Sequence, residues 1–302
     1  MDRHDSPPAP SPRRRPTVWA LVLLSVGCAP TAGEGPGHRA QRLALSPQQE
    51  YQLGVKAYQE VLREAEQKNA LVTSGPAVNR VTTVGRRIAA VATGESRMSR
   101  LLRREINLHI EGYRFDWEFA VIRSNQVNAF CLPGGKVAVF TGLLDLIDHN
   151  GGGDDWLATV LGHEIAHALA HHASERLAHE ALTERAAEVV NVGVGAISPA
   201  ERDRLLKVLA VGGRFGSLPF DRRQESEADH IGVFLMTFAG YDPRAAVIFW
   251  EAMASRGGGH VPEILSDHPS DGRRIAQLRQ WAEQALAAKR AYEAGNTADS
   301  PR

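Results

Sequence analysis

Apolar residues recur at helical spacing in the middle of the chain. They occupy positions 157, 160, 161, 165, 168 and 169, which fall on one stripe of an α-helix. The glycines at 151–153 interrupt the chain before this stripe, and Asp154 and Asp155 place negative charge where the positive end of a helix favours it. The pattern predicts a buried helix that starts just after the glycines.

Two other segments have the character of β-strands. Residues 117–122 and 136–140 alternate in polarity or run apolar over short stretches. Pro133, Gly134 and Gly135 are turn-forming residues between extended pieces. We therefore expect a small sheet, and a sheet edge beside a catalytic cleft can bind a peptide by main-chain pairing.

Helical patterns predominate in the rest of the chain. Ser46 and Pro47 are typical of a helix start. Further helices are predicted over residues 48–69, 77–92, 183–195, 199–211, 243–256 and 270–293, and the apolar pattern that follows residue 222 continues to Phe238. No internal repeat is visible. The predicted fold class is a helix-rich α+β domain with a small β-sheet.

The buried helix carries an H-E-x-x-H motif at residues 163–167. His163 and His167 are four residues apart, so both project from one face of the helix, as two ligands of one Zn²⁺ do. Glu164 lies beside them, where a general base for a zinc-activated water belongs. The alternative is an amphipathic helix with two histidines on one face, but buried and unpartnered His and Glu side chains would be costly.

A catalytic zinc needs a third protein ligand. The pattern H-E-x-x-H-x-x-G-x-x-H would require Gly at 170 and His at 173, where the chain has Ala170 and Ala173. His171 and His172 are poorly placed as ligands, and His171 is expected to lie one turn further along the helix and to be partly exposed. The third ligand is therefore expected elsewhere in the chain.

Acidic residues near position 225 are the better candidates. Glu225 and Asp229 are four residues apart and share one helix face. One carboxylate can bind the metal while the other holds a ligating imidazole. The alternative is a solvated acidic helix start, in which the helix dipole favours Glu225 and Glu227.

Four motifs in order resemble one family of zinc metallopeptidases. It includes the HtpX heat-shock protease, the mitochondrial Oma-type protease and the CAAX prenyl protease. The motifs are Asn128-Ala129-Phe130 with Pro133-Gly134-Gly135 and Thr141-Gly142-Leu143-Leu144; the H-E-x-x-H helix; Arg222-x-x-Glu225-Ser226-Glu227-Ala228-Asp229-x-x-Gly232; and His268-Pro269-Ser270 with Arg274-Ile275. The resemblance covers about residues 45–285 and is strongest to the soluble, periplasmic lipoprotein branch.

The resemblance implies a zincin-like fold of the gluzincin type and one Zn²⁺ per chain. By this likeness Glu225 is the third ligand, beside His163 and His167, and Glu227 is a bystander. Glu164 takes a proton from water and passes it to the leaving amine. Asp229 orients a ligating histidine. The role of His268 stays open between a transition-state donor, an inhibitory fourth ligand and a helix-entry residue.

Composition agrees with one catalytic domain, expected over residues 46–295. The chain has 302 residues, is 43% hydrophobic and 23% charged, and has zero formal net charge. Nothing in it suggests nucleic-acid binding, and the arginines at 97–104 are interpreted as a solvated helix face. Cys131 is expected to be a small buried residue rather than a nucleophile.

The N-terminus has the pattern of an export signal. Three arginines at 13–15 precede a short apolar run at 18–24, and Cys28 follows in a segment that resembles a bacterial lipobox. We expect a signal peptide over residues 1–27, a lipid anchor at Cys28, a linker over 28–45 and a polar tail over 296–302. The alternative is ordinary signal cleavage near Ala29.

Taken together, these patterns predict a zinc endopeptidase of the bacterial cell envelope. It would be an outer-membrane lipoprotein on the periplasmic side that cleaves polypeptides in quality control of misfolded envelope proteins. One alternative is a metal-binding envelope chaperone or scaffold with little proteolytic activity, against which the intact Glu164 argues. Another is a lipoprotein whose motif is accidental, against which the companion motifs argue.

Overall fold

The structure is a computed structural model that describes residues 31–34, 39–180, 182–193, 195, 197–209, 221–255, 264–265, 268 and 272–298. The expected signal peptide and Cys28 lie outside these residues, so the lipid anchor stays a prediction from the sequence. Of the motifs singled out above, Pro269 and Ser270 also lie outside them.

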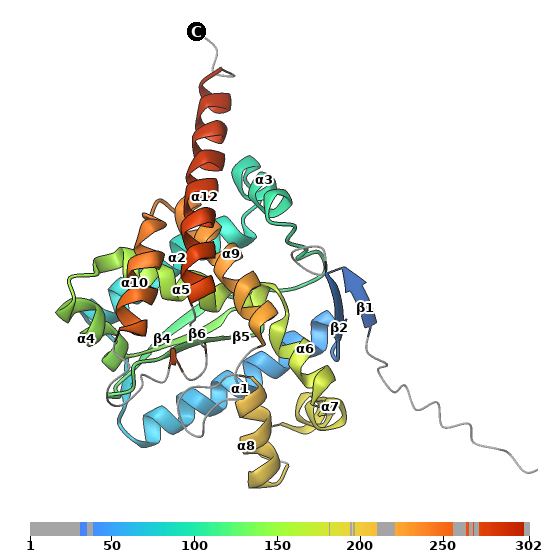
Figure 1. Ribbon diagram of the computed structural model, residues 1–302. Coiled ribbons are helices and arrows are strands. Elements are labelled where there is room, and N and C mark those ends of the chain that lie inside the picture. The colour runs from blue at the N-terminus through green and yellow to red at the C-terminus, as the bar shows by residue number, and fades with distance from the viewer. Residues whose placement is uncertain are drawn as a thin grey trace, which may run out of the picture.

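A four-stranded mixed sheet occupies the centre of the fold (Figure 1). Its strands are β3 (Leu71–Val72), β4 (Glu118–Ile122), β6 (Lys136–Phe140) and β5 (Ala129–Leu132), in that spatial order. The strands expected at 117–122 and 136–140 are confirmed as β4 and β6, but these two pair in parallel. The hairpin across Pro133 therefore joins β5 to β6, and Gly134 and Gly135 turn the chain with φ angles of 78° and 80°.

Both faces of this sheet are buried, which explains why its strands run apolar rather than alternate. Val121, Val137 and Val139 face a core shared with α2 and α5, whereas Ala138 and Phe140 face a second core shared with α1. The sheet thus lies between α1 on one side and α2 and α5 on the other (Figure 1). This layering confirms the helix-rich α+β class with a small sheet.

Most of the helices match the segments expected from the sequence. They are α1 (Pro47–Gln67), α2 (Pro76–Thr93), α3 (Arg97–Glu105), α4 (Thr141–His149), α5 (Gly153–Leu169), α6 (His172–His179), α7 (Thr183–Val192), α8 (Pro199–Val208), α9 (Arg222–Phe238), α10 (Arg244–Ala254) and α12 (Gly272–Ala298). Ser46 begins α1 with a capping box, its side chain accepting from the Gln49 amide. The sequence reading did not anticipate α4 and α6.

The helix that carries H-E-x-x-H ends earlier than expected. It stops at Leu169 because His171 adopts a left-handed backbone conformation, with φ at 56°, and α6 starts afresh at His172. The expectation that His171 continues the helix and is partly exposed is wrong. Its side chain is buried, stacks on Tyr113 at 3.6 Å between ring centroids, and its Nδ1 lies 3.0 Å from Glu50 Oε1.

Two short strands lie inside the segment expected to be a linker. β1 (Thr31–Glu34) and β2 (Ala40–Leu43) pair antiparallel. The chain after β2 is tied to α6, since Ala44 donates its amide to the Ser174 carbonyl and Leu45 donates to the Ser174 hydroxyl. β2 thereby becomes part of the folded body.

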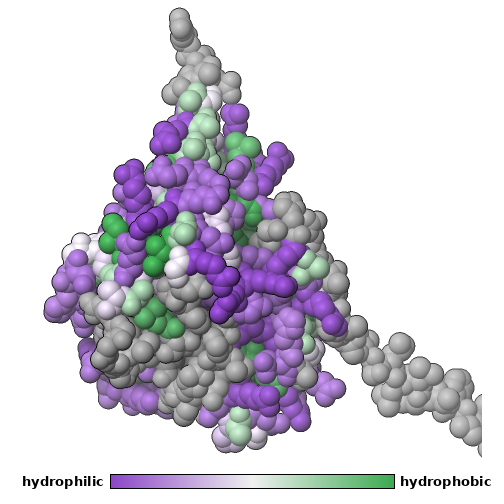
Figure 2. All heavy atoms as spheres, in the orientation of Figure 1, coloured by the Kyte–Doolittle hydropathy of each residue, from purple (hydrophilic) through white to green (hydrophobic). Residues whose placement is uncertain are grey.

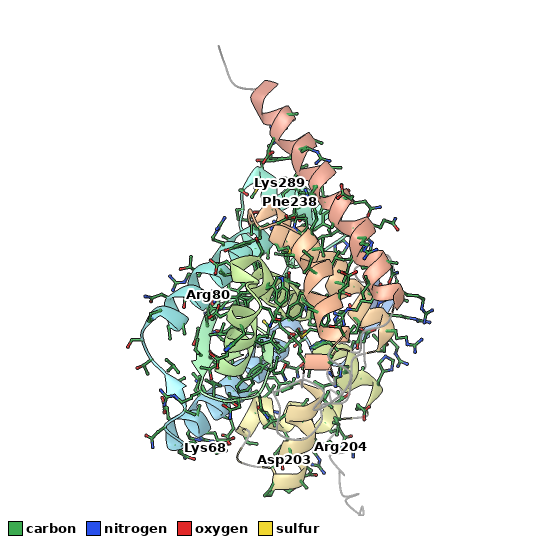
Figure 3. The ribbon with its side chains drawn as sticks, turned by 60° about the vertical axis from the view of Figure 1, so that its left-hand side comes forward. Lys68, Arg80, Asp203, Arg204, Phe238 and Lys289 are labelled. Atoms are coloured by element: carbon green, nitrogen blue, oxygen red, sulfur yellow. The ribbon has the colours of Figure 1, made fainter. Side chains whose placement is uncertain are left out.

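The C-terminal helix α12 packs along α9 and then extends beyond the body (Figure 1). Figure 3 shows Lys289 of α12 beside Phe238 at the end of α9, and Lys289 Nζ donates to the Thr237 carbonyl at 3.1 Å. The face in Figure 2 is largely hydrophilic over the described residues. None of the described helices combines the length and the apolar character required to cross a bilayer.

Helices α5 and α9 cross at two glycines. A Cβ atom on Gly162 would lie 2.9 Å from the carbonyl oxygen of Gly232, and one on Gly232 would lie 2.9 Å from the carbonyl carbon of Gly162. Any larger residue would thus push the two backbones apart. The crossing places the H-E-x-x-H residues of α5 directly against the acidic residues of α9.

We expect Gly232→Ala to destabilise the protein by about 1–3 kcal/mol, because the methyl group meets backbone atoms that cannot move independently. It should also weaken metal binding, since α9 must shift away from α5. Denaturant unfolding and zinc titration measure the two effects. Gly272→Ala is the matched control, because a Cβ there would meet no atom within 4 Å. Equal stability of both variants would contradict the tight crossing.

Candidate active site

The histidines of H-E-x-x-H meet at one point on the buried side of α5. Nε2 of His163 lies 3.0 Å from Nε2 of His167. Both rings, and the Glu164 carboxylate between them in sequence, are almost fully buried. Two imidazole nitrogens that converge in this way leave room for one shared ion.

Helix α9 supplies a carboxylate to the same point. Asp221 begins α9 with a capping box, and this start places Glu225 in the first turn. The Glu225 oxygens lie 3.5 Å from His163 Nε2 and 3.4 Å from His167 Nε2. The residue that the sequence suggested as third ligand therefore lies beside the other two.

His268 completes the cluster from the region between α10 and α12. Its Nδ1 lies 3.0 Å from His163 Nε2 and 2.7 Å from Glu225 Oε1, and its Nε2 lies 3.2 Å from Glu164 Oε1. Its exposed fraction is 1%. Of the three roles left open above, the helix-entry role leaves these contacts unexplained.

Three observations indicate that these residues can hold a zinc ion. One ligand atom from each of His163, His167, Glu225 and His268 lies within 4.8 Å of the others. Glu164 Oε1 and Glu225 Oε2 form no regular hydrogen bond and face His268 at 3.2 Å and Arg274 at 3.1 Å, so a cation would further compensate these two buried carboxylates. The set of imidazole nitrogens and one carboxylate oxygen is the donor set that zinc prefers.

The pKa shifts favour metal binding at His167 and Glu225 and oppose it at His268. Burial lowers the pKa of His167 well below its usual value, which favours the neutral ring that ligates. Burial opposes the charge on Glu225, but His268 and neighbouring charged groups lower its pKa well below the usual range. Burial likewise opposes charge on His268, yet Glu225 and Glu164 raise its pKa to about 10. A metal ion at this point would compete with the His268 proton.

A second layer holds His163 in place. Asp229 Oδ1 lies 2.9 Å from His163 Nδ1, so the carboxylate accepts from the ring and leaves Nε2 directed at the cluster. Arg274 of α12 donates to Asp229 at 2.6 and 2.7 Å and pairs with Glu225 at 3.1 Å. Its guanidinium also stacks 3.5 Å from the ring centroid of Trp250. Arg274 belongs to the fourth sequence motif, but its spacing there gave no indication of this role.

Two other expectations can be compared with the structure. Glu227 lies outside the four-residue cluster, where the sequence reading called it a bystander. Its carboxylate nevertheless contacts His172 and Arg39, two residues that the reading assigned to no site. Cys131 is buried, and burial raises the pKa of its thiol well above the usual value, which agrees with a packing role.

A metal-ligand cluster on crossed helices beside a small sheet defines a zincin-like metallopeptidase domain. The chain belongs to peptidase family M48, whose family model matches residues 92–282. The family uses zinc, so the expected cofactor and the expected class of enzyme, a hydrolase of peptide bonds, are both confirmed.

Known relatives agree with this family. The Mitochondrial metalloendopeptidase OMA1 of Arabidopsis thaliana is 37% identical over 195 residues, which are 63% of this chain and 36% of that protein. Its namesake in Schizosaccharomyces pombe is 38% identical over 56% of this chain and 48% of that protein. The Beta-barrel assembly-enhancing protease of Escherichia coli is 30% identical over 58% of this chain and 36% of that protein. The chain spans only about a third to a half of the length of these relatives.

One expectation is corrected by these relatives. The sequence reading placed the protein in a bacterial cell envelope as an outer-membrane lipoprotein. Mitochondrial proteins from plant and fission yeast are 37% and 38% identical, whereas the bacterial protease is 30% identical. The expected location is therefore contradicted. The expectation had rested on the signal-like pattern of the N-terminus and on the likeness to the soluble, periplasmic lipoprotein branch.

We expect Glu225→Ala to weaken zinc binding at least about 10–100-fold, because it removes a negatively charged ligand from a buried cluster. Zinc content after dialysis and competition with a chromophoric chelator measure the loss. Glu251→Ala, which removes a half-exposed carboxylate paired with Arg279 on the surface, should leave zinc binding unchanged. Retention of zinc in Glu225→Ala together with a large loss in Glu227→Ala would show that the other carboxylate is the ligand.

Proposed function

We propose that this protein is a zinc-dependent endopeptidase in which His163, His167 and Glu225 hold the zinc ion. The observation that carries the proposal is the convergence of these three side chains with Glu164 at one buried point between α5 and α9. When bound there, zinc supplies Lewis acidity to a water molecule and to the scissile carbonyl.

Glu164 performs the proton transfers in this proposal. Its Oε1 is buried and lies 3.2 Å from His268 Nε2 beside the cluster. A carboxylate in this position can take a proton from the attacking water and return it to the leaving amine. Asp229, held by Arg274, keeps the His163 ring oriented throughout.

The proposed substrate is an extended stretch of polypeptide. β5 is an edge strand of the sheet, and it packs against α5, the helix that carries H-E-x-x-H. We propose that the outer edge of β5 pairs with the main chain of the peptide. The main chain near this edge already accepts one such contact, because Ile264 donates its amide to the Val127 carbonyl at 3.1 Å. An unfolded protein offers extended segments, which supports a role in removing misfolded polypeptides.

Glu164→Gln tests the catalytic role against the alternative of a metal-binding chaperone or scaffold. The amide keeps the shape of the side chain but cannot accept the proton of water, so hydrolysis of casein or a quenched peptide should fall by about 10²–10⁴-fold with zinc content unchanged. Glu251→Gln serves as the control for a surface carboxylate. Turnover near that of the wild type would rule out Glu164 as the base, and a wild type that binds zinc without any cleavage would favour the scaffold.

His268 is proposed to be an inhibitory ligand rather than a transition-state donor. Its Nδ1 approaches both His163 and Glu225 more closely than 3.1 Å, so it stands where the fourth position of a catalytic zinc would lie. It also covers the carboxylate of Glu164. In this proposal the ring moves away before substrate and water reach Oε1 of Glu164.

His268→Ala should therefore raise the rate of peptide cleavage or produce self-cleavage. A transition-state donor would instead lower kcat with little change in KM when it is removed. Steady-state kinetics on a short peptide distinguish the two results. His230→Ala is a suitable control, because His230 lies on α9 against Trp281 and outside the cluster.

A further inference from the structure

His167 makes a second contact on the side of its ring that faces away from the cluster. Its Nδ1 lies 2.8 Å from Nδ1 of His172, the first residue of α6. Both rings are buried. Two ring nitrogens at this distance need one proton between them, because two lone pairs would repel each other.

The next contact decides which ring carries that proton. Nε2 of His172 lies 3.0 Å from Oε2 of Glu227. An ionised carboxylate can only accept, so neutral His172 donates from Nε2 and accepts at Nδ1. His167 must then hold its own proton on Nδ1. Its Nε2 then presents a lone pair toward the cluster, and the 3.0 Å contact with His163 Nε2 likewise needs a proton or a cation shared by the two nitrogens.

Arg39 fixes the far end of this chain of contacts. Its Nε and Nη2 donate to the two Glu227 oxygens at 2.5 and 2.7 Å. The same guanidinium pairs with both oxygens of Glu175 on α6, whose carboxylate also accepts from Gln224 at 2.8 Å. Paired contacts from arginine to a carboxylate are strong and directional. Glu227 is thus held in one orientation.

Glu225 and Glu227 contact different groups for a geometric reason. Residues two apart on a helix point about 200° from each other. Glu225 can therefore approach Nε2 of His167 while Glu227 turns toward His172 and Arg39. The two acidic residues of the E-x-E sequence have separate tasks.

We propose that His172, Glu227 and Arg39 are positioning residues that set the tautomer and orientation of His167 for zinc binding. The inference rests on the proposed role of His167 as a zinc ligand. It gives the segment just before β2 a function in the active site, because Arg39 closes the chain of contacts from outside the matched family segment.

Zinc affinity of the full-length chain tests the proposal without relying on proteolysis. His172→Leu removes the acceptor for His167 and should weaken zinc binding about 10–100-fold, measured by chelator competition at fixed pH. His172→Asn should restore most of the affinity, since its amide oxygen can accept from His167 Nδ1. His171→Asn is the control, because that residue is also buried, contacts Glu50 and Tyr113 instead, and asparagine tolerates its left-handed backbone.

A second readout reports the tautomer itself. Nitrogen NMR of the ¹⁵N-histidine-labelled metal-free protein should show His167 protonated at Nδ1 in the wild type and in His172→Asn, and a mixture of tautomers in His172→Leu. Glu227→Gln tests the same chain of contacts with a smaller change in shape. The glutamine amide has only one oxygen, so it cannot accept from both His172 and Arg39 as the two Glu227 oxygens do. We expect this variant to lower zinc affinity as well.

Wild-type zinc affinity and an unchanged His167 tautomer in His172→Leu would overturn the proposal. So would an equal loss in His172→Leu, His172→Asn and His171→Asn, because that result would mean packing rather than hydrogen bonding. A wild-type chain that binds no zinc would instead overturn the proposed function, so the two failures are distinguishable.

Discussion

The close crossing of α5 and α9 at Gly162 and Gly232 is the constraint on which the site depends. With no side chain at either position, the two backbones approach within van der Waals contact. The zinc-ligand candidates of α5 and Glu225 of α9 then meet within 3.5 Å. A wider crossing would leave the carboxylate too distant to share an ion with two imidazoles. The packing of two helices thus sets the geometry of the chemistry.

Burying this many polar and charged side chains opposes folding unless each is paired. Two arginines provide such pairs, one behind His163 and one behind His167. Arg274 holds Asp229, which accepts from His163. Arg39 holds Glu227, which is linked through His172 to His167. His163 and His167 therefore each end a separate chain of contacts that is anchored by a guanidinium.

Local patterns predicted much of this molecule. The H-E-x-x-H helix, the segments that became β4 and β6, and the acidic pair on α9 were visible because side-chain periodicity follows backbone geometry directly. The end of α5 was misjudged, since the left-handed turn at His171 is stabilised by Glu50 and Tyr113 from distant segments. The expected bacterial location was wrong because it rested on a signal-like N-terminal pattern and on likeness to one branch of a family whose members occur in both mitochondria and bacteria.

The sequence by itself determined which residue types could bind zinc and on which helices they lie. It could do so because spacing along one helix places residues on one face. Only the tertiary structure decided that Arg39, His172 and Glu227 lie behind His167, that Arg274 clamps Asp229, and that His268 enters the cluster. These residues come from segments far apart in the chain, and their contacts arise from how helices and strands pack, which no local spacing encodes.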